Sequence, residues 1–119
     1  MDRAQAALRH PATPVEVKAE LVALLVLEHE QPIDDAILAA LDHWRSPLVS
    51  ARVALARGVR GGVSELRGAI AALDAADLGP DAARARTLLA LRSGSVADRE
   101  DAERHLRRIG DLLFLEKLV

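Results

Sequence analysis

Histidines and carboxylates are the residues of this chain that could bind a metal ion or transfer protons. The closest group of such residues is Glu28, His29 and Glu30. Adjacent side chains on a helix point about 100° apart, so these three do not converge on one ion. The histidines as a set are scattered along the chain: His10, His29, His43 and His105. The sequence therefore predicts no metal site.

Two carboxylate clusters could supply a general acid or base, but each lies where a helix is expected to begin. They are Asp34-Asp35 and the group Asp98, Glu100, Asp101 and Glu103. Acids in the first turn of a helix are stabilised by its dipole, which accounts for both clusters without catalysis. No phosphate-binding glycine loop and no serine-nucleophile motif is present. We therefore expect a protein that is not an enzyme and that needs no cofactor.

Charge is distributed unevenly along the chain. Residues 1–44 carry three basic and eight acidic side chains, whereas residues 45–119 carry thirteen basic and ten acidic ones. A basic face that binds nucleic acid is one interpretation of the arginine-rich stretch 45–67. Because aromatic side chains that stack on bases are missing, a solvated helix surface explains this stretch better. Its arginines are Arg45, Arg52, Arg57, Arg60 and Arg67.

The composition predicts an all-α chain. Half of the 119 residues are apolar, and alanine and leucine dominate that half, with one tryptophan, one phenylalanine and no tyrosine. Alanine and leucine favour helices, whereas strands favour β-branched and aromatic residues. The length matches a single domain, residues 1–119.

Cysteine content and the length of apolar runs indicate the cellular location of the protein. Cysteine is absent, and the first residues lack the apolar run of a signal peptide. The longest apolar run, residues 21–27, is far shorter than the roughly 20 residues that span a bilayer. We expect a soluble, cytoplasmic protein with no membrane partner.

Proline and glycine divide the chain at helix-length intervals. Thr13 is expected to cap a helix that starts at Pro14, Gly58 to end the third long helix, and Asp98 to cap the last one. The expected helices are 2–9, 14–30, 33–44, 47–58, 63–77, 81–92 and one from about 99 toward the C-terminus. Short connections predict antiparallel neighbours, which gives hairpins at about 14–44, 47–77 and 81–118.

A shift of 36 residues aligns the second half of the chain with itself. It pairs core-type residues with core-type residues, as in Val53 with Leu89, Leu55 with Leu91, Leu66 with Ala102, Ile70 with Leu106, and Leu73 with Ile109. Two helices per unit and a period near 34 residues resemble tetratricopeptide repeats. Leu89-Ala90 resembles the large–small pair of that family's first helix, and Ala102 resembles the small residue of its second helix.

The sequence of the second half is also similar to the repeat regions of actinobacterial multidomain transcriptional regulators. The matching residues are 78–86 (LGPDAARAR), Gly94, Ala102 to Leu106, and Leu113-Phe114. The resemblance implies a right-handed array of hairpins that binds partners or senses ligands. In a tetratricopeptide array the first helix of each pair lines the binding surface. The resemblance thus implies that partners contact Leu48, Ala51, Leu55, Arg84, Thr87 and Leu91.

Arg84 would be the charged anchor for an acidic segment of the partner. The C-terminal stretch 112–119 is apolar on nearly every side, so it either folds back onto the core, docks on a partner or a second copy, or continues a longer array. Its expected contact residues are Leu112, Phe114 and Leu115. Trp44 is either a packing plug or, if exposed, a binding anchor.

We therefore expect a regulatory or scaffolding protein that binds another protein or peptide. Three different interpretations remain open. Residues 46–52 (SPLVSAR) resemble the start of a HEAT-like unit, the 45–67 stretch would suit a nucleic-acid-linked regulator, and residues 21–27 could line the pocket of a small-molecule sensor.

Overall fold

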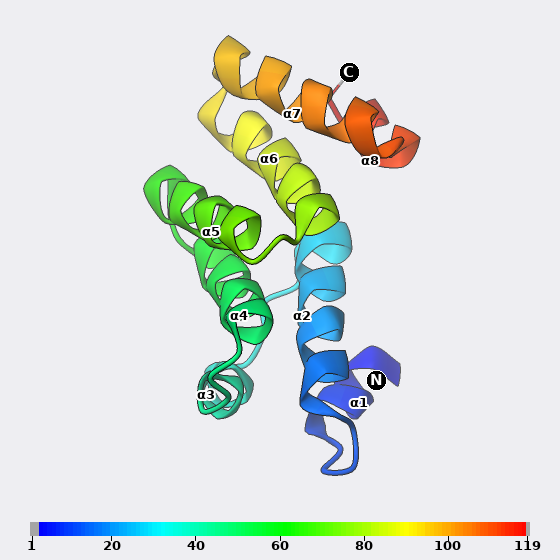
Figure 1. Cartoon of the computed structure of the whole chain (residues 1–119), viewed down its shortest axis with the longest axis vertical. Coiled ribbons are helices and arrows are strands. Elements are labelled where there is room, and N and C mark those ends of the chain that lie inside the picture. Colours follow the sequence, from blue (N-terminus) through cyan, green and yellow to red (C-terminus); the bar gives the residue numbers. More distant parts are fainter. Residues whose placement is uncertain (1–2, 119) are drawn as a thin grey trace.

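The computed structural model describes residues 3–118, and within that range the chain is entirely helix and connecting loop (Figure 1). Residues 2 and 119 of the expected terminal segments lie outside the described residues. No helix between residues 3 and 118 combines the length and apolar character needed to cross a bilayer. The all-α expectation is confirmed. The helices are α1 (Arg3–Arg9), α2 (Val15–His29), α3 (Asp35–Asp42), α4 (Pro47–Arg60), α5 (Val63–Ala75), α6 (Gly79–Ser93), α7 (Val96–Ile109) and α8 (Leu112–Glu116).

Short polar side chains and glycines set many of the helix ends. The hydroxyls of Ser46 and Ser95 each accept a hydrogen bond from the backbone N–H three residues later, at the starts of α4 and α7. Gly94 and Gly110 end α6 and α7 in the left-handed conformation, with φ of 66° and 72°. Gly110 interrupts the long final helix expected from the sequence, so residues 112–116 form a separate helix.

Three expected boundary residues have other roles. Pro14, not Thr13, is the N-cap of α2, and no side chain caps that helix. Asp98 lies inside the first turn of α7, where it accepts hydrogen bonds from Arg67. Gly58 does not end α4, which continues to Arg60.

Helix α4 is the centre of the packing. It contacts α2, α3 and α5, and its Val49, Val53 and Leu55 side chains are at most 1% exposed. Helix α5 packs in turn against α6, which pairs with α7, while α8 contacts both α6 and α7. The pairs α4–α5 and α6–α7 are thus closely packed neighbours.

The expected hairpin at 14–44 is not a closely packed pair. Helices α2 and α3 make few direct contacts, and α3 packs on α4 instead. In Figure 1, α2 runs up the picture while α3 is seen end-on, so the two helices are not antiparallel neighbours. The connection begins with Glu30 in the left-handed conformation (φ 47°) and passes through Pro32, which directs the chain away from α2.

The 36-residue correspondence holds for some pairs and fails for others. Leu55 is fully buried whereas Leu91 is 57% exposed, and Leu73 is fully buried whereas Ile109 is 39% exposed. Helix α6 begins 32 residues after α4, and α7 begins 33 residues after α5, so the helices recur at a shorter interval than 36. Both members are buried in the pairs Val53 with Leu89, Leu66 with Ala102, and Ile70 with Leu106.

Arginine–aspartate pairs cross the helix interfaces. The side chain of Arg86 in α6 is 13% exposed and binds Asp74 of α5 at 2.6 Å and Asp101 of α7 at 3.0 Å. Arg52 of α4 binds Asp81 of α6 at 2.9 Å, with both side chains largely buried. Because arginine donates from a rigid fork, each pair fixes the position of one helix relative to another. Further pairs between helices are Arg57–Asp42, Arg60–Asp35, Arg67–Asp98 and Arg84–Asp111.

Gly58 marks a close approach of α4 to α5. A Cβ atom at this position would lie 3.0 Å from the Cβ of Ala69 and 3.1 Å from the carbonyl oxygen of Glu65. Gly68 in α5 has no neighbour within 4 Å of the same point, so a methyl group there meets open space. The two glycines therefore offer a matched pair of tests.

We expect Gly58→Ala to lower the free energy of unfolding by about 1–3 kcal/mol, because the added methyl group forces α4 and α5 apart. Gly68→Ala should instead raise it by about 0.5–1 kcal/mol, because alanine is the better helix former. Urea denaturation followed by circular dichroism measures both changes. A change of the same sign in the two variants would contradict the close approach at Gly58.

Candidate binding groove

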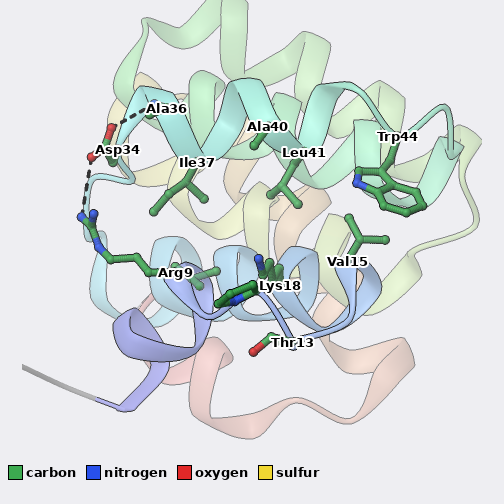
Figure 2. Close-up of a pocket in the computed structure, with 12 residues that line it drawn as sticks. Arg9, Thr13, Val15, Lys18, Asp34, Ala36, Ile37, Ala40, Leu41 and Trp44 are labelled. Atoms are coloured by element: carbon green, nitrogen blue, oxygen red, sulfur yellow. Dashed lines mark hydrogen bonds and ion pairs between the residues drawn. The ribbon is translucent and has the colours of Figure 1, made fainter.

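The open space between α2 and α3 forms a surface groove, closed at one side by α1 and the loop that follows it (Figure 2). Its volume is about 400 Å³. The lining side chains come from four consecutive segments of the chain: Leu8, Arg9, Pro11, Thr13, Val15, Lys18, Asp34, Ala36, Ile37, Ala40, Leu41 and Trp44. The groove exists because α3 packs on α4 and leaves this side of α2 uncovered.

Apolar side chains form most of the two walls. Ile37 and Leu41 lie one helical turn apart on α3 and point toward α2, and Val15 faces them from the first turn of α2 (Figure 2). Ile37 and Val15 are partly exposed, whereas Leu41 is 2% exposed. Trp44 follows α3 at one end of the groove and is 56% exposed. Of the two roles considered for Trp44, packing plug or exposed anchor, its exposure fits the second. The groove offers a partner the partly exposed side chains of Ile37 and Val15 and the indole ring of Trp44.

The charges of the groove are few and unevenly placed. Arg9 forms an ion pair with Asp34 at 3.6 Å, at the end opposite Trp44. Lys18 lies between the two ends and forms no ion pair within residues 3–118. These three side chains carry a net charge of one positive unit, located on Lys18.

Three of the residues expected to contact a partner are buried. Ala51 is 2% exposed, and Leu55 and Thr87 are fully buried, so the expectation that they line a binding surface is wrong. Helix α4 packs against α2, α3 and α5, and α6 packs against α2, α5, α7 and α8. Leu48 and Leu91 are exposed, at 43% and 57%, but neither lines the groove between α2 and α3.

Arg84 is not a free anchor for an acidic partner. Its Nε donates to Asp111 at 2.7 Å, and its guanidinium lies 5.2 Å from the centre of the Phe114 ring. Asp111 also accepts a hydrogen bond from the backbone N–H of Phe114, which starts α8. Arg84 thereby docks α8 onto α6.

The C-terminal stretch is divided between core and surface. Phe114 is 4% exposed, so the expectation that it contacts a partner is wrong. Leu115 is half-buried, and Leu112 is 68% exposed. The segment therefore folds back onto the core through one face and leaves the other open.

The arginine-rich stretch 45–67 is largely engaged in ion pairs with aspartates. Arg52, Arg57, Arg60 and Arg67 each bind an aspartate of another helix, at 2.9, 2.6, 2.7 and 2.7 Å. The positive charge that a nucleic-acid interface requires is thus compensated by neighbouring carboxylates. Nothing in this arrangement favours a nucleic-acid-linked role.

Residues 21–27 belong mainly to the core. Most of their side chains are buried, and none of them lines the groove between α2 and α3. Within residues 3–118, no group of three or more histidines, cysteines and carboxylates lies close enough to hold a metal ion.

None of the residues expected from the sequence to contact a partner lines the groove between α2 and α3. Of the residues that do line it, only Trp44 is predicted from the sequence as an anchor, if exposed. The position of Val15 and Lys18 opposite α3 depends on how α2 and α3 are oriented, which local periodicity does not encode.

The hydroxyl of Thr87 is buried without a hydrogen-bond partner. An unpaired buried hydroxyl is destabilising, so we expect Thr87→Val, which keeps the shape of the side chain, to raise the free energy of unfolding by about 1 kcal/mol. Thr13→Val, at the half-buried threonine of the groove, should change it far less. Thermal unfolding measures both, and a clear loss of stability in Thr87→Val would contradict this account.

The docking of α8 should depend on pH. Burial raises the pKa of Asp111, but hydrogen bonds from Arg84 and from the Phe114 N–H, with the charges of Arg84 and Lys117, lower it more, so the pKa lies below its ordinary value of 3.8. A depressed folded-state pKa stabilises the fold above the unfolded pKa, and this contribution is lost as the pH falls through the folded value.

We therefore expect stability to fall in acid, and Asp111→Asn to show a smaller fall below about pH 4. At pH 7 this variant should lose about 1 kcal/mol of unfolding free energy, because its charge-assisted hydrogen bond is weakened. Urea denaturation at pH 7 and pH 3 measures both effects. Asp77→Asn, at an exposed aspartate, is the control and should keep the wild-type pH dependence of stability. If Asp111→Asn showed the same unfolding free energies as Asp77→Asn at both pH values, the docking role of Asp111 would be refuted.

Comparisons with known proteins give the groove no counterpart. The chain matches no model of a protein family, no curated protein and no solved structure.

Proposed function

We propose that this chain is a non-catalytic protein-binding module, and that the groove between α2 and α3 holds an amphipathic helical segment of a partner. The observation that carries this proposal is Trp44. It is the only tryptophan of the chain, it is 56% exposed, and it stands at the end of an apolar row. Tryptophan is enriched among the residues that dominate the energy of protein interfaces.

The spacing of the row suits a helix as the bound segment. Ile37 and Trp44 are separated by seven positions, or about two helical turns, with the buried Leu41 between them, so they lie about 10 Å apart along the direction of α3. A helical segment that presents apolar side chains at the same spacing can pack along such a row, as in other helix-in-groove complexes. The groove volume of about 400 Å³ is enough for a few large apolar side chains.

The charge of the groove adds a requirement on the partner. Lys18 lies on the groove wall without an ion partner within residues 3–118, whereas Arg9 and Asp34 are paired with each other. A carboxylate on the bound segment would pair with Lys18. Within the groove, only Asp34 would repel it. The proposed partner is thus an amphipathic helix that carries an acidic residue beside its apolar face. A regulatory or scaffolding role would follow from that binding.

We also propose that α4–α5 and α6–α7 are two units of a tetratricopeptide-like array. Corresponding helices begin 32 and 33 residues apart, close to the period of about 34 residues of that family. The second helix of one pair packs on the first helix of the next, which is how consecutive units of an array adjoin. In this proposal α2 and α3 are a splayed terminal unit, and their opening is the binding site.

A display library of helix-forming peptides of about 16 residues, long enough to be partly helical, tests the binding proposal. We expect selection on the wild-type protein to enrich peptides with apolar residues at helical spacing and at least one acidic residue. Trp44→Ala should weaken binding of an enriched peptide at least about tenfold, because it removes the largest exposed contact. Lys18→Glu should weaken it by about threefold to tenfold and reduce its dependence on acidic residues.

Matched controls are available elsewhere on the chain. Leu24 in α2 is 40% exposed and lies outside the groove, so Leu24→Ala should bind the peptide like the wild type. Arg108→Glu reverses an exposed charge on α7 and serves as the control for Lys18→Glu. No enrichment, or equal binding by Trp44→Ala and Leu24→Ala, would refute the groove as the binding site.

A further inference from the structure

Helices α7 and α8 lie at the end of the molecule opposite α3 (Figure 1), and together with α6 they carry a second exposed apolar surface. Among the described residues, the four large apolar side chains with the greatest exposure all belong to α6, α7 and α8. They are Leu91 at 57%, Val96 at 71%, Leu112 at 68% and Leu113 at 76%. Exposed apolar side chains gathered in one region mark interaction surfaces, whereas scattered ones carry no such meaning.

Two grooves join most of these side chains into one strip. The first, about 370 Å³, lies between α7 and α8 and includes Leu112 and Leu115. The second, about 270 Å³, lies where α6 passes into α7 and includes Leu91 and Val96. Arg99 and Leu118 line both grooves.

The strip follows α7 because the chain turns back along this helix after Gly110 (Figure 1). Arg84 holds the turn in place through its ion pair with Asp111, so the strip belongs to the packed structure. The 14 residues of α7 correspond to a length of about 21 Å. A surface of this length can accommodate a helix of comparable size.

The charges on the strip are balanced. Arg99, Glu103, Arg107 and Glu116 line the groove between α7 and α8, which gives two positive and two negative charges. Glu103 and Arg107 neutralise each other at 2.8 Å. Arg99 and Glu116 form no ion pair within residues 3–118, although both border the same groove. One unpaired cation and one unpaired anion thus stand on the rim of a single apolar surface.

We infer that this strip is a self-association surface that binds a second copy of the chain about a two-fold axis. In a two-fold dimer each contact between different residues occurs twice, so Arg99 of one copy faces Glu116 of the other, and the reverse. Both free charges are then paired at once, and the apolar side chains between them are covered. A strongly acidic or basic partner would pair one free charge and repel the other. This inference is independent of the peptide groove between α2 and α3.

Charge reversal tests the two-fold pairing. Sedimentation equilibrium of the full chain should show a monomer–dimer equilibrium. Arg99→Glu and Glu116→Arg should each weaken the dimer by about tenfold, because two attractive contacts become repulsive. An equimolar mixture of the two variants should recover association, because one copy then carries two glutamates and the other two arginines. The double variant should also recover it.

Controls separate this effect from unfolding and from unspecific stickiness. Arg108→Glu makes the same charge change on α7 outside both grooves and should leave the dimer unchanged. Leu112→Gln should weaken association, whereas Leu48→Gln, at an exposed leucine of α4, should not. Circular dichroism verifies that each variant is folded. A wild-type chain that stays monomeric at millimolar concentration would overturn the inference, as would charge variants that associate like the wild type or fail to associate when mixed.

Discussion

Helix α4 buries Val49, Val53 and Leu55 against three other helices, and the positions of those helices follow from this burial. Gly58 allows α5 to approach closely on one side. On another side lies α3, which has only eight residues. It packs on α4 and leaves one side of α2 uncovered. The groove beside Trp44 is therefore open because α3 packs against α4 and not against α2.

The core that results contains mainly leucine, valine and alanine, with Phe114 as its one buried aromatic side chain among the described residues. Small and similar side chains fill space well but leave several helix registers nearly equal in energy. Directional contacts between helices remove this ambiguity. Arg86, held by Asp74 on one side and Asp101 on the other, fixes α6 relative to both α5 and α7. The same chemistry compensates the positive charge of the arginine-rich stretch, so that stretch is better explained by architecture than by nucleic-acid binding.

Local chemistry made much of the fold predictable. Pro47 and Ser46 at the start of α4, and Gly94 at the end of α6, are where the sequence places helix ends, because caps and left-handed turns depend on a few adjacent residues. Gly58 misled this reasoning, because its role is a contact with α5 and not the end of α4. A glycine that permits close packing and one that ends a helix look alike in a single sequence.

The candidate site was less predictable, for a related reason. A shift of 36 residues pairs Leu55 with Leu91, yet one is fully buried and the other is 57% exposed. Which face of a helix is covered depends on neighbours far away in the sequence. Trp44 could be identified by residue type alone, but its exposure depends on the separation of α2 from α3. Sequence periodicity therefore finds helices and their apolar stripes, and the structure is needed to show which stripes remain open.

The central claim is that a partner segment lies against Trp44, and the chain contains the means to test it. Trp44 is the only tryptophan, so the tryptophan fluorescence of the protein reports on the groove alone. The test is a titration with a bound peptide that lacks tryptophan, followed by emission and by quenching with iodide. The account predicts a shift of the emission to shorter wavelength and protection from iodide, with the saturation curve of the binding itself. Saturable binding that leaves both the emission and the quenching of Trp44 unchanged would contradict it.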